Sequence, residues 1–286
     1  LYLLLSAIVI IGLYASWLRF TRGLGPTTNL SDAVPWGLWI WMDLTWIAIS
    51  SGAFIFCAGF FVFHLESLRP IVRLAVLTAF TGYAISGLAL IYDLGLPLHF
   101  WHPIVMWNFH STMFEISWCL MLYSSVLAME LSIPITDGLG LKTLSALLHK
   151  FCVLLAIAGA ILSLLHQSSF GTLFLLTPGK LHPLWYSSWL PLLFLASAIS
   201  GGSGFLILEL FLAERFLKWN FPTRLVKSLG KILLATQLIY LFLLTPDLTR
   251  LGKWHLLFEE LANSAGQECP ACWFSLEIIG GLILPI

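Results

Sequence analysis

Long apolar stretches dominate this chain and limit the folds that it can adopt. Seven of them are long enough to cross a hydrocarbon layer of about 30 Å as helices, and an eighth begins near the end of the sequence. They occupy residues 1–18, 36–63, 74–94, 112–131, 150–166, 188–212, 226–245 and 273 onward. Hydrocarbon tolerates only helices or closed barrels, and the alternating pattern of barrel strands is absent. The sequence therefore predicts an all-α, polytopic integral membrane protein with about eight spans.

Composition supports this prediction. The chain is 59% hydrophobic and 10% charged, whereas soluble proteins carry about 25% charged residues. Its net charge of zero argues against nucleic acid as a partner. The first apolar run has neither a charged leader nor a cleavage site, so we interpret it as a span rather than a signal peptide. Because the chain starts at Leu1 and its eighth apolar run is short, we expect a piece of a longer protein.

Basic residues favour one of the two sets of loops that alternate along the chain. The first set comprises residues 19–35, 95–111, 167–187 and 246–272, and the second comprises residues 64–73, 132–149 and 213–225. Five lysines and arginines fall in the first set and nine in or beside the second. The positive-inside rule places the second set in the cytoplasm. We call that side the basic face. The outward side holds most of the tryptophans, so we call it the Trp-rich face.

Polar residues also gather at the Trp-rich face. Five of the eight histidines lie in "LPLHFWHPIVMWNFH", "HQSSFGTLF" and "KLHPLWYSSW". An aromatic belt at the headgroup level explains scattered tryptophans, but it does not explain clustered histidine, asparagine and glutamine. We therefore expect a polar pocket at this face.

Acidic side chains interrupt several spans. Near the middle of a membrane helix, an ionisable group costs at least about 2.5 kcal/mol and usually has a function. The candidates are Asp43, Asp93, Glu115, Glu209 and Glu277. Asp43 and Asp93 lie near helix ends, where interfacial solvation explains them equally well, and Glu209 is close enough to an end to reach the headgroups.

Glu115 is the hardest of these acids to explain by solvation. It follows His110 by five residues, which places it about 8 Å deeper along a helix. Trp118, Cys119 and Leu122 share its helix face, so its carboxyl group must point to protein or water. It either handles protons or forms a structural hydrogen bond between helices, and we favour the first interpretation.

The sequence offers no clear site for a resident redox cofactor. No span carries a pair of histidines suited to stacked haems. Cys269 and Cys272 have a C-x-x-C spacing, but without a second pair we favour packing or a local disulfide over a metal or cluster. We expect no haem and no iron–sulphur cluster. A quinone fits better, because it needs hydrogen-bond donors, a proton source and an apolar slot.

Several stretches resemble the NrfD, or polysulfide reductase, family of membrane subunits. They are "GLGPTTNLSDAVPWGLWIWMDL", "NFHSTMFEISWCLMLY", "HQSSFGTLF", "HPLWYSSWLPLLF" and "FSLEIIGGLILP". The likeness runs from about residue 23 to the end and is strongest to the hydrogenase-2 and menaquinone reductase branches. It implies about ten helices in the whole protein, two related four-helix bundles and no bound cofactor. A weak echo of "MFEISWCLMLY" in "WFSLEIIGGLIL" agrees with two related units.

The resemblance also implies partners and a location. A ferredoxin-like iron–sulphur subunit would dock on the outer, periplasmic face of a bacterial cytoplasmic membrane, alongside further catalytic redox subunits, with menaquinone as the most fitting quinone. We divide the chain into residues 1–35, the first span and outer loop; 36–187, the N-terminal four-helix bundle with the quinone site; and 188–286, the start of the second bundle.

Site residues are carried over from the family by position. The matching residues are Trp36, Gly37, Trp39, Asp43, Glu115, His166, Gln167, His182, Glu209 and Glu277. One departure concerns the end of the third span, where related chains often carry an arginine shortly after an Asp-x-Gly. Here Leu96 follows Asp93 and Gly95, so His99 or His102 would have to replace that arginine.

We therefore expect the quinone-reactive membrane subunit of a respiratory oxidoreductase complex. Asp43, His110 and Glu115 would act in catalysis. Quinone would be bound by Trp36, Gly37, Trp39, Asp93, His166, Gln167 and His182. Glu115, Glu209 and Glu277 would form a proton path that makes turnover electrogenic. The alternatives are a solute or ion transporter, because two units with buried acids suit alternating access, and a passive anchor for redox subunits.

Overall fold

The computed structural model describes residues 2–32, 34–250, 252–263 and 269–283, which form helices joined by short loops. The long helices are α1 (Tyr2–Arg22), α3 (Leu38–Phe63), α4 (Val72–Asp93), α6 (Thr112–Gly138), α7 (Lys142–Leu176), α8 (Leu190–Leu217) and α9 (Thr223–Arg250). The short ones are α2 (Leu24–Thr27), η1 (Glu66–Ile71), η2 (Pro97–His99), α5 (His102–Val105), η3 (Pro178–Lys180), α10 (Lys253–Asn263), α11 (Pro270–Leu276) and the π-helix η4 (Glu277–Ile283).

The number of membrane-crossing helices agrees with the sequence. In the described part of the chain, seven helices are long and apolar enough to span a membrane, with η1 and α4 forming one span. α11 and η4 occupy the start of the eighth apolar run. The all-α, polytopic fold is thereby confirmed, whereas the two related bundles and the three-part division of the chain stay predictions.

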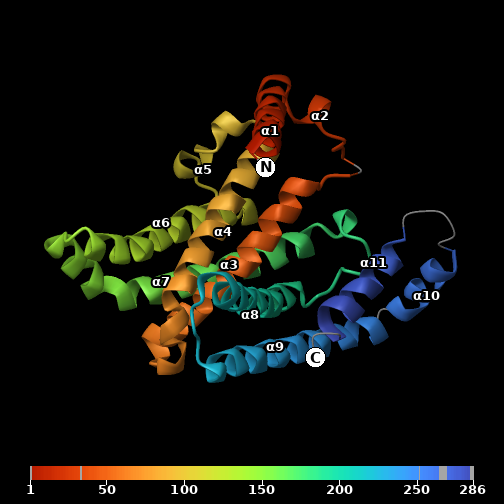
Figure 1. The fold of residues 1–286 in the computed structure, drawn as a ribbon. Helices are drawn as coiled ribbons and strands as arrows, with labels where there is room; N and C mark the ends of the chain where they lie inside the picture. Colours follow the sequence, from red (N-terminus) through yellow and green to blue (C-terminus); the bar gives the residue numbers. More distant parts are fainter. Residues whose placement is uncertain (1, 33, 251, 264–268, 284–286) are drawn as a thin grey trace.

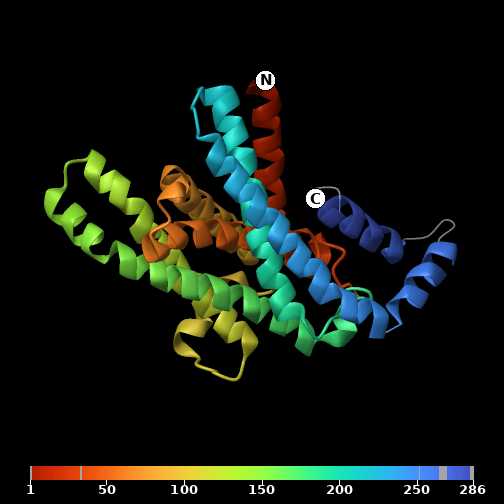
Figure 2. The same cartoon turned by 90° about the horizontal axis from the view of Figure 1, so that it is seen from below.

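Helix α3 lies at the centre of the molecule. It forms a hairpin with α4 and also contacts α7 and α8 (Figure 1). Helices α6 and α7 run side by side as a long hairpin that projects to one side in both Figure 1 and Figure 2, and α8 pairs with α9. Helix α1 is exposed along most of its length and joins α4 through Ser16 and Arg19 near its C-terminal end.

Glycines set the close contact between α3 and α8. A Cβ atom on Gly52 would lie 1.9 Å from the carbonyl oxygen of Ala198, and one on Gly202 would lie 2.4 Å from the backbone nitrogen of Ala53. Small residues allow membrane helices to approach in this way. By contrast, a Cβ atom on Gly201 or Gly204 would meet nothing within 4 Å. Within "SGGSG", Gly202 is therefore the glycine that the packing requires.

Helix α7 is much longer than the predicted span at residues 150–166. The prediction that residues 167–187 form a loop is wrong over its first part, because the helix continues to Leu176. The hydroxyl groups in this part bind the helix backbone. Ser169 donates to the carbonyl oxygen of Leu165 at 2.8 Å, and Thr172 donates to that of Ser168 at 2.9 Å. Polar residues can thus continue a membrane helix without unpaired hydroxyl groups.

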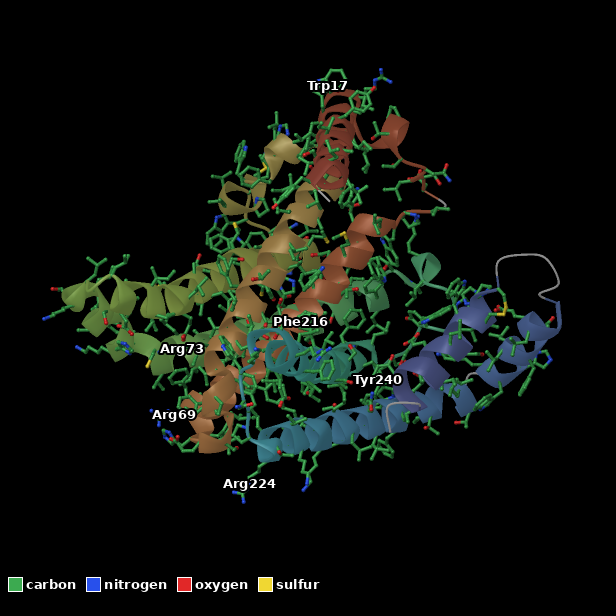
Figure 3. All side chains as sticks on the ribbon, in the orientation of Figure 1. Trp17, Arg69, Arg73, Phe216, Arg224 and Tyr240 are labelled. Carbon is green, nitrogen blue, oxygen red and sulfur yellow. A yellow bond between two sulfur atoms is a disulfide. The ribbon has the colours of Figure 1, made fainter. Side chains whose placement is uncertain are left out.

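The basic residues group as the alternation of loops predicts. Figure 3 shows Arg69, Arg73 and Arg224 on one side of the molecule and Trp17 far from them. Arg69 belongs to η1 between α3 and α4, Arg73 lies at the start of α4, and Arg224 lies at the start of α9. These connections are separated in sequence but share one face.

A second, smaller core joins the loop before α8 to the C-terminal helices. Its buried residues are Leu184, Leu244, Leu248, Leu257, Ala271 and Phe274. Lys253 at the start of α10 is 2% exposed and donates to the carbonyl oxygens of Leu184 and Tyr186, at 3.3 and 2.5 Å. Burial lowers the pKa of its ammonium group, and Asp247 acts in the opposite direction.

The two cysteines of the C-x-x-C pair lie at the start of α11. Cys269 and Cys272 form a disulfide. The interpretation as a local disulfide is therefore confirmed. This disulfide closes the first turn of α11, within the segment 246–272 that the sequence assigns to the Trp-rich face.

Candidate functional site

Asp43 lies in the second turn of α3 and is buried against α4. It is 1% exposed, and its Oδ1 atom accepts a hydrogen bond from the hydroxyl group of Ser86. Its Oδ2 atom has no partner among the described residues. Interfacial solvation therefore does not explain this acid. A buried carboxyl group with a free acceptor oxygen can take a proton or a ligand.

A cavity opens beside Asp43, between α1, α3 and α4. Its volume is about 490 Å³, within the range of roughly 300–1,000 Å³ that is typical of small-molecule sites. Its lining is mostly apolar and includes Trp39 and Met42 of α3 and Ile85 of α4. Since Met42 precedes Asp43 and Ile85 precedes Ser86, the Asp43–Ser86 pair lies directly behind this wall. We call this cavity the α1–α4 pocket.

Polar groups line one end of the α1–α4 pocket. The hydroxyl groups of Ser16 and Tyr92 lie 2.6 Å apart. Arg19, which is 4% exposed, donates to the carbonyl oxygens of Tyr92 and Leu94 at 2.7 and 2.5 Å. The Trp39 ring packs against Tyr92, with 4.7 Å between ring centroids. This end therefore combines hydroxyl and guanidinium donors with a flat aromatic surface.

Asp93 lies at the same end, in the last turn of α4. It is partly buried, and its charge interacts with that of Arg19. Its Oδ1 atom has no hydrogen-bond partner in the described part of the chain. Of the predicted set, Trp39 lines this cavity, while Asp43 and Asp93 directly follow the lining residues Met42 and Tyr92 and lie within electrostatic range of each other.

Glu115 lies between α6 and α7. Its Oε1 atom lies 2.8 Å from the hydroxyl oxygen of Ser169, whose single proton is shared between this carboxyl group and the carbonyl oxygen of Leu165. This is the interhelical bond that the sequence left open as the alternative to proton handling. It does not exclude proton handling, because a carboxyl group that accepts one hydrogen bond can still exchange a proton.

His166 and Gln167 lie inside the bundle. His166 is fully buried, and neither ring nitrogen has a hydrogen-bond partner among the described residues. Its ring packs on Phe170 and Tyr83, at centroid distances of 4.9 and 5.6 Å. Gln167 donates to the hydroxyl group of Ser51 at 3.3 Å. Both residues therefore face α3 and α4, as a role in the bundle interior requires.

Tyr83 connects these interior residues with both acids. Its hydroxyl group lies within electrostatic range of Asp43 and of Cys119, and Cys119 lies within range of Glu115. The buried polar groups of α3, α4, α6 and α7 thus form one connected cluster and are not isolated from one another.

Trp36 and Gly37 lead into α3 at its Trp-rich end. The Trp36 ring meets Phe174 edge to face at 4.5 Å, which ties this entry to the end of α7. A Cβ atom on Gly37 would lie 3.1 Å from Cδ2 of Leu30. These two residues shape the entry to the bundle and do not line the α1–α4 pocket.

His110 and His182 lie away from the pocket. His110 is exposed in the loop before α6, where its backbone N–H donates to the Asn108 side chain at 3.2 Å. His182 lies near the C-terminal helices, with Nε2 3.2 Å from Oε1 of Glu260. The structure therefore does not place these two histidines with Asp43.

The two remaining acids belong to other helix pairs. Glu209 of α8 accepts hydrogen bonds from the hydroxyl group of Thr78, at 2.8 and 2.7 Å. Glu277 accepts from the indole nitrogen of Trp185 at 2.7 Å and from the hydroxyl group of Tyr240 at 3.3 Å. Each acid has its own local partners.

Sequence reasoning missed several residues of this neighbourhood. Arg19 was counted only as a loop charge, and Tyr83 was treated as part of an apolar run. Glu130 was not among the acids considered, although it lies within the fourth apolar stretch and is 4% exposed. Its spacing of seven residues from Tyr123 was an available signal, because residues seven apart share a helix face.

Comparison with known families identifies the chain. The family model described as "Polysulphide reductase, NrfD" matches residues 26–286. The chain belongs to the NrfD family. It is thus a multi-pass membrane protein of a family of membrane subunits.

Individual relatives of this NrfD-family chain are similar over most of its length. A Nitratidesulfovibrio vulgaris protein is 36% identical over 97% of the chain and 72% of its own length. The "Probable Ni/Fe-hydrogenase 2 b-type cytochrome subunit" of Escherichia coli is 33% identical over 71% of the chain and 53% of its own length. The "Menaquinone reductase, integral membrane subunit" of N. vulgaris is 32% identical over 82% and 59%. The chain thus spans little more than half of the last two relatives.

Proposed function

We propose that this NrfD-family chain is the quinone-reactive membrane subunit of a respiratory oxidoreductase complex, with the α1–α4 pocket as its quinone site. The pocket carries the proposal, because it is an apolar slot beside the exposed helix α1 with donors at one end. Relatives named as a menaquinone reductase subunit and as an "Hdr-like menaquinol oxidoreductase integral membrane subunit" of Archaeoglobus fulgidus support a menaquinone-type ring.

The residues of the pocket suit the chemistry of a quinone. Interconversion of quinone and quinol moves two electrons and two protons, and the ring oxygens need hydrogen-bond donors. The hydroxyl groups of Ser16 and Tyr92 and the guanidinium group of Arg19 supply such donors, while Trp39 packs on the ring face. Asp43, behind the wall, exchanges the proton, and Ser86 holds its carboxyl group in place.

Glu115 exchanges the second proton in this proposal. It is connected to Asp43 through Tyr83 and Cys119, whose positions are given above. Coupling to proton translocation through Glu209 and Glu277 is a further proposal. Thr78 of α4 holds the carboxyl group of Glu209, and Trp185 and Tyr240 hold that of Glu277.

Electrons have to pass to or from another subunit. No group of three or more histidines, cysteines and acids suited to a metal lies in the described ranges. We propose that a ferredoxin-like iron–sulphur subunit docks on the Trp-rich face, on the periplasmic side of a bacterial cytoplasmic membrane. The loop that contains α5 supports this, because large apolar side chains such as Leu98 and Phe109 are 83% and 76% exposed there.

The described histidines do not fit a haem, although the E. coli relative is named a b-type cytochrome subunit. A haem needs at least one axial ligand with open space at its metal side. All eight histidines are described, and His166 is the one that is fully buried. Its ring is packed edge-on against Tyr83 and close to Phe170. A haem is therefore not part of the proposed mechanism.

A substitution that fills the pocket tests the quinone site. A Cβ atom on Gly12 would meet nothing within 4 Å, and Gly12 lines the pocket. Gly12→Phe should therefore fold normally, fill the slot and abolish quinone turnover by the full complex. Gly87→Phe is the matched control, because Gly87 of α4 also has open space but lies outside the pocket lining.

The two rival functions give different results. A passive anchor would leave quinone turnover equal in Gly12→Phe, Gly87→Phe and the unaltered complex. A transporter would move a solute across vesicles without an electron donor. Either result would remove the quinone site from the α1–α4 pocket.

A further inference from the structure

A second cavity lies toward the basic face, in the four-helix part of the molecule. It measures about 180 Å³ and is enclosed by α3, α4, α6 and α7. Phe61, Val76 and Leu131 form apolar parts of its wall. We call this cavity the Glu130 pocket, because Glu130 of α6 is the buried acid that lines it.

The carboxyl group of Glu130 is buried with one of its oxygen atoms unpaired among the described residues. The residue is 4% exposed, and its Oε1 atom has no hydrogen-bond partner among the described residues. The backbone adds a second free acceptor at the same place. Pro134 lies in the same helix and has no N–H, so the carbonyl oxygen of Glu130 lacks its usual helix hydrogen bond. Buried polar groups of this kind are normally satisfied by ordered water.

The mouth of the Glu130 pocket is polar. Asp137 accepts a hydrogen bond from Ser145 and lies 3.1 Å from Nε2 of His149. Arg73 of α4 lines the same cavity and interacts with the charge of Asp137. The side chains of Asp137 and His149 are 40% and 54% exposed, so the mouth reaches the surface. Charged and titratable groups therefore connect the surface with Glu130.

The groups that face Glu130 come from every helix around it. Cys57 of α3 and Cys152 of α7 both lie within electrostatic range of its carboxyl group. Arg73 comes from α4, while Tyr123 and Asp137 come from α6. Arg73 adds a positive charge to the acids of this set, so the lining of the pocket holds charges of both signs.

Buried hydroxyl groups continue from the Glu130 pocket into the bundle. Tyr123 is fully buried and lies within electrostatic range of Glu130, on the same face of α6. Its ring meets that of Tyr83 at 4.4 Å, and Tyr83 meets His166 at 5.6 Å. The hydroxyl groups of both tyrosines and both nitrogens of His166 lack hydrogen-bond partners in the described part of the chain.

We propose that Glu130 is a proton-exchange site that opens to the basic face and connects with Asp43 through Tyr123 and Tyr83, with the His166 ring beside Tyr83. Glu130 takes a proton from water in its pocket or releases one there, and the hydroxyl groups pass it along the bundle. The role of this path in quinone chemistry rests on the proposed function. The accessibility and reactivity of Glu130 do not, so they can be tested separately. The path differs from the one through Glu209 and Glu277.

Carbodiimide labelling tests the site in the full complex. A lipid-soluble carbodiimide adds to protonated carboxyl groups in apolar surroundings, and mass spectrometry locates the adduct. We expect an adduct at Glu130 in membrane vesicles and its loss in Glu130→Gln. Cys152 also lines the pocket, so a charged thiol reagent applied from the basic face should modify it and obstruct the cavity. Prior modification of Cys152 should therefore abolish the adduct at Glu130.

The control keeps the pocket open. In Cys152→Ser the thiol reagent has no target in the pocket, so the adduct at Glu130 should form with or without it. The proposal would be overturned if Glu130 formed no adduct, or if the adduct formed equally well before and after modification of Cys152. Loss of quinone turnover in Gly12→Phe bears only on the α1–α4 pocket. If Gly12→Phe keeps its quinone turnover while Glu130 is labelled, the proposed function is wrong, but the proton-exchange site at Glu130 is still supported.

Discussion

At the scale of single residues, Asp43 and Glu115, the two acids proposed to exchange the protons of the quinone, have different surroundings. Asp43 is sealed against α4 with one free oxygen, whereas Glu115 bridges α6 and α7 through Ser169. The shared feature is a hydrogen bond from a hydroxyl donor to one carboxyl oxygen. Such a bond fixes the carboxyl group and leaves its second oxygen for a proton.

Glu115→Gln separates the proton role of this residue from its structural role. Glutamine keeps an oxygen that can accept the hydrogen bond from Ser169, so the complex should assemble normally. It cannot exchange a proton at neutral pH, and loss of a positioned acid or base lowers rates by about 10²–10⁴-fold. We therefore expect quinone turnover to be lost at unchanged expression, measured with purified complex and a soluble quinone analogue.

Ser169→Ala is the matched control for this change. It removes the hydrogen bond at Oε1 but keeps the carboxyl group, and a hydrogen bond contributes about 1 kcal/mol to stability. Turnover should persist with a slightly lower melting temperature. If Glu115→Gln turned over quinone at full rate, Glu115 would have no part in the mechanism.

A candidate residue could be predicted from the sequence only where its side chain is of a type that is rare inside a membrane span. An acid inside an apolar run is expensive, so Asp43 and Glu115 could be identified. Tyr83 and Tyr123 could not, because an aromatic residue in a span is ordinary and only its unpaired hydroxyl group marks it. His110 was predicted to act in the site because it is close to Glu115 in sequence, but it lies exposed in a loop.

At the scale of helices, contact between α3 and α8 depends on a single glycine of "SGGSG". Gly202→Ala puts a methyl group 2.4 Å from backbone atoms of α3, which cannot move aside as a flexible side chain would. Overpacking of this kind costs about 1–3 kcal/mol. We expect a clear drop in the melting temperature of the detergent-solubilised protein.

The neighbouring glycines supply the control for that experiment. Gly201→Ala and Gly204→Ala add the same methyl group on the same helix where nothing lies within 4 Å. Alanine favours a helix over glycine by roughly 1 kcal/mol in soluble peptides, so these variants should melt at or above the original temperature. Equal melting of all three variants would mean that the close approach at Gly202 does not stabilise the protein.

Helix positions could be predicted better than helix ends. Each apolar run corresponds to a helix because hydrocarbon demands internal backbone hydrogen bonds. The end of α7 could not be placed, since Ser168, Ser169 and Gly171 resemble loop residues when their partners are unknown. That error mattered for the site, because the extension carries Gln167, which donates to Ser51, and Ser169, which contacts Glu115.

At the scale of the whole molecule, topology places the two cavities near opposite ends of α3, where Met42 lines one and Phe61 lines the other. The α1–α4 pocket lies at the Trp-rich end of α3 and α4, and the Glu130 pocket lies toward the basic face. The sequence predicted an asymmetric protein with a polar outer end, because charge and aromatic residues are visible in it. It could not predict the second cavity, which depends on how α3, α4, α6 and α7 pack.

The cysteines provide a test of how this asymmetry is oriented in the membrane. The Cys269–Cys272 disulfide lies at the start of α11, in the segment assigned to the Trp-rich face, and Cys152 lines the Glu130 pocket toward the basic face. If the basic face is cytoplasmic, as the positive-inside rule requires, the disulfide faces the oxidising side, where such bonds persist. A membrane-impermeant reductant followed by a charged maleimide should then label Cys269 and Cys272 in intact cells, and label Cys152 only in inverted vesicles.

Two buried thiols complete this experiment as internal controls. Cys57 and Cys119 are buried among the helices, so they should stay unlabelled from either side until the protein is denatured. Labelling of Cys152 in intact cells, together with protection of the disulfide, would reverse the orientation. Partner docking would then have to move to the cytoplasmic side, because the exposed aromatic loop around α5 lies on the same face as the disulfide. The direction in which Glu130 exchanges protons would reverse with it.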